Sequence, residues 1–280
     1  MSMSIAALQS LGRAVSYRAA SLTAARSPRS VYASFKRGMI FAADTILHDE
    51  DPVFDFVDWE SLGAALDLEV SMPLTAADRS TTAHEKLCLA VLLKLQDPGT
   101  IIELGTYRGA TTQLLFRNAP ERARLFTFDI PSDIDRRDVD RGRLIDLAEA
   151  RLADDFDREF VPQSPRVTQL YADLTRVDWR EIRALPRPDF VFIDADHSYE
   201  GCLRDTQNVL AWAGDKAMVV WHDAAWRNFD CIEANYGVHA SIVAATPPEA
   251  RGYTFRLKHT SLIVRAPRHQ ALLRQHLLGP

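Results

Sequence analysis

The fold of this chain is decided by a stretch that reads Thr100-Ile101-Ile102-Glu103-Leu104-Gly105. It is a short, β-rich run of apolar residues that ends in glycine, which is typical of a buried strand followed by a tight turn. Just before it, apolar residues at helical spacing over residues 82–95 stop at Asp97-Pro98-Gly99, a sequence that ends helices. The stretch is therefore predicted to be a strand that follows a helix.

Similar apolar runs recur along the rest of the chain and alternate with helical patterns. The runs lie at residues 124–130, 167–174, 190–194 and 218–221. The helical patterns between them lie at residues 110–118, 140–160 and 198–213. Strands that are apolar on both faces and alternate with helices are typical of a parallel sheet covered on each side. We therefore expect an α/β fold with a doubly wound, mostly parallel sheet.

Two segments near the end of the chain are expected to complete the sheet. Ser241 to Ala245 and Thr254 to Arg265 predict an antiparallel hairpin at a sheet edge, because apolar and polar residues alternate in the second segment. We expect the sheet domain to occupy residues 96–280, with the sheet itself at about 99–267. The preceding residues, 1–95, are expected to form a helical extension or lid.

The charge of the chain is unevenly distributed. Residues 1–43 hold six cationic side chains and no acidic one, so the formal net charge of −5 for the whole chain leaves −11 for residues 44–280. An acidic body argues against nucleic acid as a partner, because phosphate binding needs a basic face. The basic arm is expected to be a lid, a contact in a homo-oligomer or a contact with an anionic surface.

The apolar runs and the cysteines do not point to a membrane or to an oxidising compartment. The longest strongly apolar stretch, around residues 87–95, is interrupted by Lys94 and is far shorter than the roughly 20 residues that span a bilayer. The three cysteines, Cys88, Cys202 and Cys231, are odd in number and widely separated. We therefore expect a reducing, cytoplasmic location and no transmembrane segment.

Candidate binding residues follow the first strand. Gly105 and Gly109 lie four apart, so the backbone can turn tightly and approach a ligand, and Glu103 offers a carboxylate beside them. The pattern lacks the third glycine of GxGxxG and the Lys-Ser/Thr of a phosphate-cradling loop, which disfavours a nucleoside triphosphate. A plain strand-to-helix turn explains the two glycines equally well.

Acidic residues end the next two strands. Asp129 is placed where an acidic residue accepts ribose hydroxyls in nucleotide-binding sheets, and Asp173 follows the third strand. Either one alone could be a helix N-cap, the commonest role for Asp after a strand. Both of them in register with the glycine loop favour a ligand that contains adenosine.

The fourth and fifth strands end in the richest polar cluster. Asp194, Asp196 and His197 follow the fourth strand, and His222-Asp223 follows the fifth. Because ligands bind outside the carboxyl ends of such strands, these side chains are expected to converge on a site suited to Mg²⁺ or Mn²⁺, with an imidazole available as a general base. The alternative is that Asp196 and Asp223 only cap the helices that follow.

These residues carry a resemblance to a known family. Residues 102–111 with 123–129 resemble the cofactor half of the S-adenosylmethionine-dependent O-methyltransferases of the catechol O-methyltransferase type. Residues 193–200 with His222-Asp223 resemble the bacterial branch that modifies macrolides and sugars. The resemblance covers roughly residues 80–265. It implies a class I, Rossmann-like, seven-stranded sheet with a C-terminal antiparallel hairpin.

The resemblance also implies roles for individual residues. Asp129 would hold the ribose hydroxyls of S-adenosylmethionine and Asp173 would lie near its adenine. The other implied cofactor-binding residues are Glu103, Gly105, Thr106, Tyr107, Gly109, Thr111 and Asp194.

The implied metal ligands are Asp194, His222 and Asp223. The family often has Asp-Asp or Asp-Asn at the last pair, and the imidazole of His222 is a poorer Mg²⁺ ligand than a carboxylate. His197 is the first candidate for the catalytic base, and Asp196 is the second.

The function expected from this resemblance is methyl transfer to a hydroxyl group of a small molecule, in secondary metabolism, with help from Mg²⁺ or Mn²⁺. A sugar, a polyketide or macrolide, and a phenol are all open as acceptors. Loops at residues 131–143 and 224–236, the second holding Trp226, Phe229 and Tyr236, are expected to form the acceptor pocket. Two rivals stay open, a nicotinamide-dependent oxidoreductase and a non-catalytic protein on the same fold.

Overall fold

The computed structural model describes residues 51, 53–73, 81–130, 145–146, 159–224 and 232–278. Its strands are β1 (Asp55–Val57), β2 (Thr100–Leu104), β3 (Arg124–Asp129), β4 (Ile145–Asp146), β5 (Val167–Tyr171), β6 (Phe190–Ile193), β7 (Met218–Trp221), β8 (Thr254–Leu257) and β9 (Ile263–Arg265). The α-helices are α3 (Trp59–Ala65), α4 (Ala83–Gln96), α5 (Ala110–Asn118), α8 (Trp179–Arg183), α9 (Tyr199–Ala213), α10 (Ile232–Ala245) and α11 (Gln270–Arg274).

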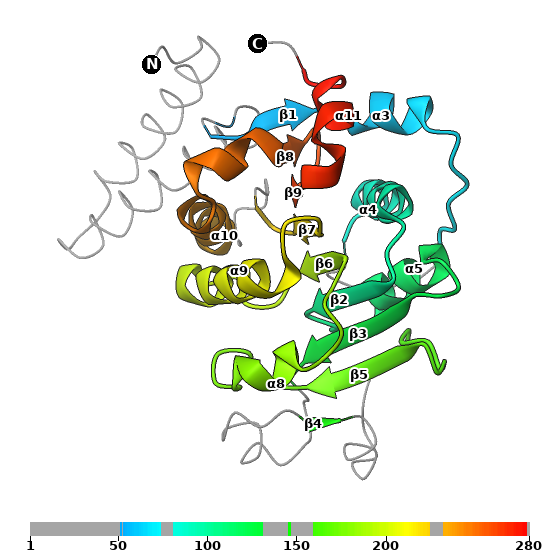
Figure 1. Ribbon diagram of the computed structural model, residues 1–280, viewed down its shortest axis with the longest axis vertical. Coiled ribbons are helices and arrows are strands. Elements are labelled where there is room, and N and C mark those ends of the chain that lie inside the picture. The colour runs from blue at the N-terminus through cyan, green and yellow to red at the C-terminus, as the bar shows by residue number, and fades with distance from the viewer. Residues whose placement is uncertain are drawn as a thin grey trace, which may run out of the picture.

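All of these strands form one nine-stranded sheet in the order β1-β8-β9-β7-β6-β2-β3-β5-β4 (Figure 1). They run parallel except for β4 and β9. From β2 the chain adds β3 and β5 on one side, then returns to add β6 and β7 on the other. The expected doubly wound, mostly parallel sheet is therefore confirmed. The expected seven strands form its central part, with β1 and β4 added at the edges.

The sheet separates two buried cores because successive strand residues point to opposite faces. In β2, Ile102 and Leu104 pack into one core and Ile101 packs into the other. Helices α9 and α10 cover the first face and α4 and α5 cover the second (Figure 1). This arrangement leaves the carboxyl ends of the central strands between the two helical layers.

The expected hairpin is present, but its boundaries were predicted wrongly. The residues from Ser241 to Ala245 form the last turns of α10, and the hairpin is made by β8 and β9, both within residues 254–265. The apolar, β-branched sequence suggested a strand. In the structure Val238 and Ile242 lie one helical turn apart, and both are buried in the core beside α9. Tertiary packing therefore favours a helix over the strand that the local sequence suggests.

Two other expected segments differ in part from the structure. The helix expected over residues 140–160 contains the short strand β4, which pairs with β5, and most of its remaining residues lie outside the described ranges. The extension over residues 1–95 is not wholly helical, since β1 joins the sheet beside β8. Residues 1–50 also lie outside the described part of the chain, so the role of the basic arm stays a prediction.

The helix expected over residues 82–95 is α4. Thr82 and Glu85 form a capping box at its start, in which each side chain accepts the backbone N–H of the other residue. None of the helices in the described ranges has the length and hydropathy that a membrane crossing requires.

Candidate active site

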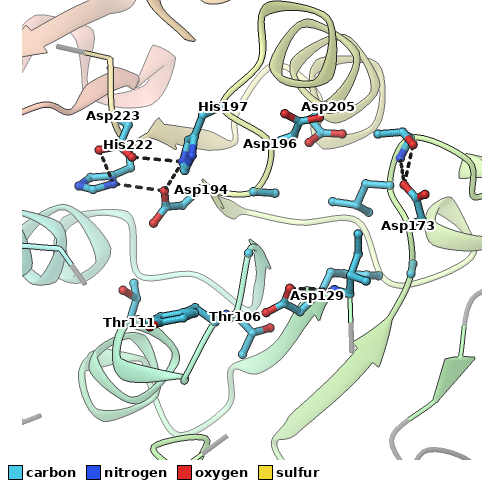
Figure 2. A pocket seen from close by; sticks show the side chains of 18 of the residues that line it. Thr106, Thr111, Asp129, Asp173, Asp194, Asp196, His197, Asp205, His222 and Asp223 are labelled. Atoms are coloured by element: carbon cyan, nitrogen blue, oxygen red, sulfur yellow. Dashed lines mark hydrogen bonds and ion pairs between the residues drawn. The ribbon is translucent and has the colours of Figure 1, made fainter. Parts of the chain in front are cut away.

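A cavity of about 500 Å³ lies at the carboxyl ends of the central strands (Figure 2). Its position is the one expected for a ligand site in a doubly wound sheet. It is lined by nearly all the predicted site residues: Gly105, Thr106, Tyr107, Thr111, Asp129, Asp173, Asp194, Asp196, His197, His222 and Asp223. Two predicted residues, Glu103 and Gly109, are not among its lining residues.

The loop after β2 depends on its glycines. Gly105 has a φ of 98°, and a Cβ there would lie only 2.0 Å from the carbonyl oxygen of Asp194. Gly109 has a φ of 85°, and a Cβ there would lie 2.4 Å from the side chain of Val161. Both positions need glycine, because other residues are strained at such φ values and would also collide. Gly105 thus lets the β2 loop approach the end of β6.

Glu103 lies beneath this loop. It is fully buried, and its Oε2 accepts hydrogen bonds of 2.6 Å from the hydroxyls of Thr112 and Thr127. Burial, with a contribution from the charges of Asp194 and Asp129, raises the pKa of Glu103 to about 8. Its contact with a cofactor stays a prediction, and the structure instead shows it joining β2, β3 and α5.

Asp129 and Asp173 both reach the cavity. Asp129 accepts the backbone N–H of Tyr107 at 2.6 Å, so its carboxylate also fixes the glycine-containing loop. Asp173 Oδ1 accepts both the backbone N–H and the hydroxyl of Thr175, at 2.9 and 2.6 Å. The two aspartates therefore shape the loops on either side of the cavity as well as lining it.

At the end of the cavity near β6 and β7, two carboxylates and two imidazoles form a cluster. The Nε2 atom of His197 lies 3.2 Å from Asp194 Oδ1 and 3.1 Å from Asp223 Oδ2. Nδ1 of His222 lies 3.2 Å from the same oxygen of Asp194. His222 is buried, whereas 38% of the His197 side chain is exposed. The four predicted residues thus converge, with His197 the more accessible imidazole.

The charges in this cluster stabilise one another. Burial alone would raise the pKa of Asp194, but the two histidines hold it down at about 2. The hydrogen bond that His197 donates to Asp194 raises the pKa of His197. For His222, burial opposes protonation, yet the carboxylates around it raise its pKa well above the ordinary value. The cluster therefore holds cationic charge between its carboxylates.

Glu85 contacts the buried histidine of the cluster, and it was not predicted as a site residue. Its Oε2 lies 3.4 Å from His222 Nε2. Its Oε1 accepts both the backbone N–H and the hydroxyl of Ser261, at 2.8 and 2.5 Å. The sequence signal at Glu85 was the capping box with Thr82, which predicts a helix start but no contact with a distant histidine.

Asp196 is turned away from the cluster. Its Oδ1 accepts the backbone N–H of Ser198, and its Oδ2 lies over Gly201, where a Cβ would be 2.0 Å away. Figure 2 shows the Asp196 side chain beside Asp205 of α9 and apart from His197. Of the two predicted bases, His197 is therefore the one that joins the other catalytic candidates.

The donor set at the cluster suits a divalent cation. One ligand atom each from Asp194, His197 and Asp223 lies within 4.8 Å of the others. Carboxylate oxygens with imidazole nitrogen fit Mn²⁺ and other first-row metals better than Mg²⁺. The group that could hold a cation thus contains His197, whereas the sequence predicted His222 there. His222 stays in contact with Asp194 beneath it.

The predicted acceptor pocket falls largely outside the described residues. Residues 131–143, Trp226 and Phe229 lie outside the described residues, as does the side chain of Tyr236.

Residues 102–224 match the family model of a methyltransferase domain. No curated protein matches the chain. Among solved structures, a methyltransferase of Podospora anserina, PaMTH1, bound to S-adenosylhomocysteine, is similar over 74% of this chain and 83% of its own, at 12% identity and a TM-score of 0.49. An O-methyltransferase of Bacillus cereus, bound to the same ligand, is similar over 82% and 99%, at 15% identity and a TM-score of 0.43.

A further similar structure is TomG of Streptomyces achromogenes, an O-methyltransferase of tomaymycin synthesis in complex with S-adenosylmethionine. The similarity covers 81% of this chain and 95% of TomG, at 16% identity and a TM-score of 0.39. The matched region contains the glycine-containing loop, Asp129, and the cluster up to Asp223. Residues 102–224 of this chain therefore match a methyltransferase domain, and the sheet that holds them is doubly wound and mostly parallel.

Proposed function

We propose that this protein is an S-adenosylmethionine-dependent methyltransferase that methylates a hydroxyl group of a small molecule. The observation that carries the proposal is a single cavity in a methyltransferase domain, with the glycine-containing loop and Asp129 in one part and a histidine between two carboxylates in another. Similar structures that hold S-adenosylmethionine or S-adenosylhomocysteine support the choice of cofactor. A sugar, a polyketide or a phenol is proposed as the class of acceptor.

The cofactor residues follow from the lining of the cavity. The backbone of the loop at Gly105 and Tyr107 would hold the methionine end, and Asp129 would accept the ribose hydroxyls. When bound, S-adenosylmethionine supplies a methyl group on a positively charged sulfur, which is already electrophilic. The protein therefore has to align the acceptor and remove its proton.

His197 is the proposed base. In its neutral form the imidazole would take the proton of the acceptor hydroxyl, and the carboxylates of Asp194 and Asp223, which lie against Nε2, would stabilise the imidazolium that results. Its partial exposure gives the acceptor access to the ring. Asp196 is the weaker candidate, because its carboxylate accepts from Ser198 and lies over Gly201.

A divalent cation is proposed at Asp194 and Asp223, completed by His222 as expected or by His197 as the geometry favours. Bound there, a cation would lower the pKa of a neighbouring hydroxyl. His197 is proposed as either a metal ligand or the base. In His197→Ala, a base role predicts lost turnover with Mn²⁺ affinity kept. A ligand role predicts that both are lost.

The first experiment is calorimetry of the purified protein with S-adenosylhomocysteine. We expect binding at micromolar concentrations, and no binding at hundreds of micromolar would refute the proposal. Binding of a nicotinamide cofactor in its place would favour the oxidoreductase alternative. Binding of S-adenosylhomocysteine without methyl transfer to any hydroxyl compound would favour a non-catalytic role.

The second experiment tests the metal. Turnover is expected to fall in EDTA and to return with Mn²⁺ or Mg²⁺. Full activity in EDTA would mean that turnover needs no metal. Asp194 and Asp223 would then serve to orient His197 and to stabilise its protonated form.

A further inference from the structure

A second acidic group lies in the same cavity, away from the histidines. Asp205 of α9 lies beside Asp196 of the loop that precedes this helix, and Asp173 approaches from the loop after β5 (Figure 2). All three line the cavity. The mechanism proposed above uses none of them for proton transfer, so this group needs its own explanation.

Asp205 is the unusual member of the group. Its residue is only 2% exposed, and its Oδ1 has no hydrogen-bond partner within the described part of the chain. The neighbouring Arg204 instead donates to the backbone oxygen of Thr175. A buried acceptor without a partner is costly, because it has lost its water and gained no replacement. Such an atom beside a cavity is therefore expected to bind a donor from a ligand.

The neighbouring charges also favour a donor at this place. Burial, with the negative charges of Asp196 and Asp173, raises the pKa of Asp205 to about 7, and Arg204 offsets this only in part. A hydrogen-bond donor placed among these oxygens would relieve both the missing hydrogen bond and the repulsion between them.

The position of Asp205 in the cavity indicates which hydrogen-bond donor of a ligand it would bind. In doubly wound sheets the acid after the second strand holds a ribose, which places the cofactor's sugar at Asp129. The glycine-containing loop lies on one side of that point, next to the histidine cluster. The adenine ring of the cofactor would then lie on the other side of Asp129. That part of the cavity has apolar surfaces from Ile130 and Leu174, which suit the faces of a flat ring.

We propose that Asp205 accepts a hydrogen bond from the exocyclic amino group of the cofactor's adenine, so that this end of the cavity selects a 6-aminopurine. The proposal rests on the proposed function. It assigns to Asp205 the recognition that the sequence had suggested for Asp173. The reason is that Asp173 Oδ1 already accepts two hydrogen bonds from Thr175, whereas Asp205 Oδ1 accepts none from the described residues.

The test compares two ligands by calorimetry. One is S-adenosylhomocysteine, and the other is its analogue with hydrogen in place of the 6-amino group. The wild-type protein should bind the first about ten- to a hundredfold more tightly, since a carboxylate acceptor would be left unpaired by the second. Asp205→Leu keeps the branching at Cγ but has no acceptor, and should bind the two ligands within about threefold of each other.

Two further variants keep the result interpretable. Asp205→Asn retains one weaker acceptor oxygen and should show an intermediate preference, which also covers the case in which the leucine variant does not fold. Asp173→Asn can keep the turn at Thr175 and should retain the wild-type preference. Wild-type preference persisting in Asp205→Asn and Asp205→Leu, or lost in Asp173→Asn, overturns the inference.

The outcome also separates this inference from the proposed function. Wild-type protein that fails to bind S-adenosylhomocysteine refutes the proposed function. Wild-type protein that binds it but does not discriminate against the analogue refutes only the role of Asp205.

Discussion

Replacing Glu103 by glutamine should change how the stability of the protein depends on pH. Glu103 is fully buried, and its pKa is raised to about 8 from an ordinary value of 4.5. Below pH 4.5 both the folded and the unfolded chain keep the proton. Between pH 4.5 and 8 the unfolded chain releases it while the folded protein retains it, so the free energy of unfolding falls as the pH rises. Above pH 8 the loss is complete.

The size of the effect follows from the pKa difference. The two pKa values differ by about 3.5, and each pH unit is worth about 1.4 kcal/mol. The free energy of unfolding therefore changes by about 5 kcal/mol as an upper limit. Relaxation around the charged form reduces this, so we expect about 2–5 kcal/mol. Glutamine resembles the neutral acid, since its oxygen can accept from Thr112 and Thr127 as Glu103 Oε2 does. The Glu103→Gln variant should therefore lack this part of the pH dependence.

The assay is denaturant unfolding, followed by tryptophan fluorescence, from pH 5 to pH 9. The stability of Glu103→Gln relative to the wild type should rise steadily across this range and level off near pH 8. Glu249→Gln, at an exposed position, is the matched control and should follow the wild type. Parallel curves for the wild type and Glu103→Gln would refute the reasoning, because they would show that Glu103 is charged in the folded protein.

Three further substitutions test the contacts around the cavity. Gly105→Ala puts a Cβ 2.0 Å from the Asp194 carbonyl oxygen, so it should lose about 2–4 kcal/mol of stability and most binding of S-adenosylhomocysteine. Gly201→Ala should lose about 1–3 kcal/mol in denaturant unfolding, because the Asp196 carboxylate must move. Glu85→Gln should lose about 2–4 kcal/mol yet bind S-adenosylhomocysteine within threefold of wild type. Wild-type stability in any of them contradicts the packing described.

The parallel strands could be predicted from the sequence because of where they lie. Strands buried on both faces are short, continuous apolar runs, and here Gly, Pro or Asp follows the end of each parallel central strand within two residues. The end of α10 could not be predicted in the same way. Its β-branched residues favour a strand locally, and only packing against α9 makes it a helix. Residues 145–146 join the sheet by pairing with β5, which local periodicity does not indicate.

The candidate site likewise contains residues that could be predicted from the sequence and one that could not. Asp194, His197, His222 and Asp223 could be predicted because they directly follow strands, and the carboxyl ends of neighbouring parallel strands meet at one edge. Asp205 could not, because it lies within a helix, where an acidic residue is ordinarily read as solvated surface. Only the packing of α9 against the sheet buries it beside the cavity.

The contacts of Glu85 extend the candidate site beyond residues 102–224, the region that matches the family model. Glu85 lies in α4 and binds Ser261 in the turn between β8 and β9, and both residues are outside the matched region 102–224. Yet Glu85 is also the residue that contacts the buried side of His222. A chain cut to the matched region would keep His222 and Asp194 but leave Nε2 of His222 without this carboxylate. The contacts of His222 therefore involve helix α4 before the matched region and, through Glu85, the hairpin after it.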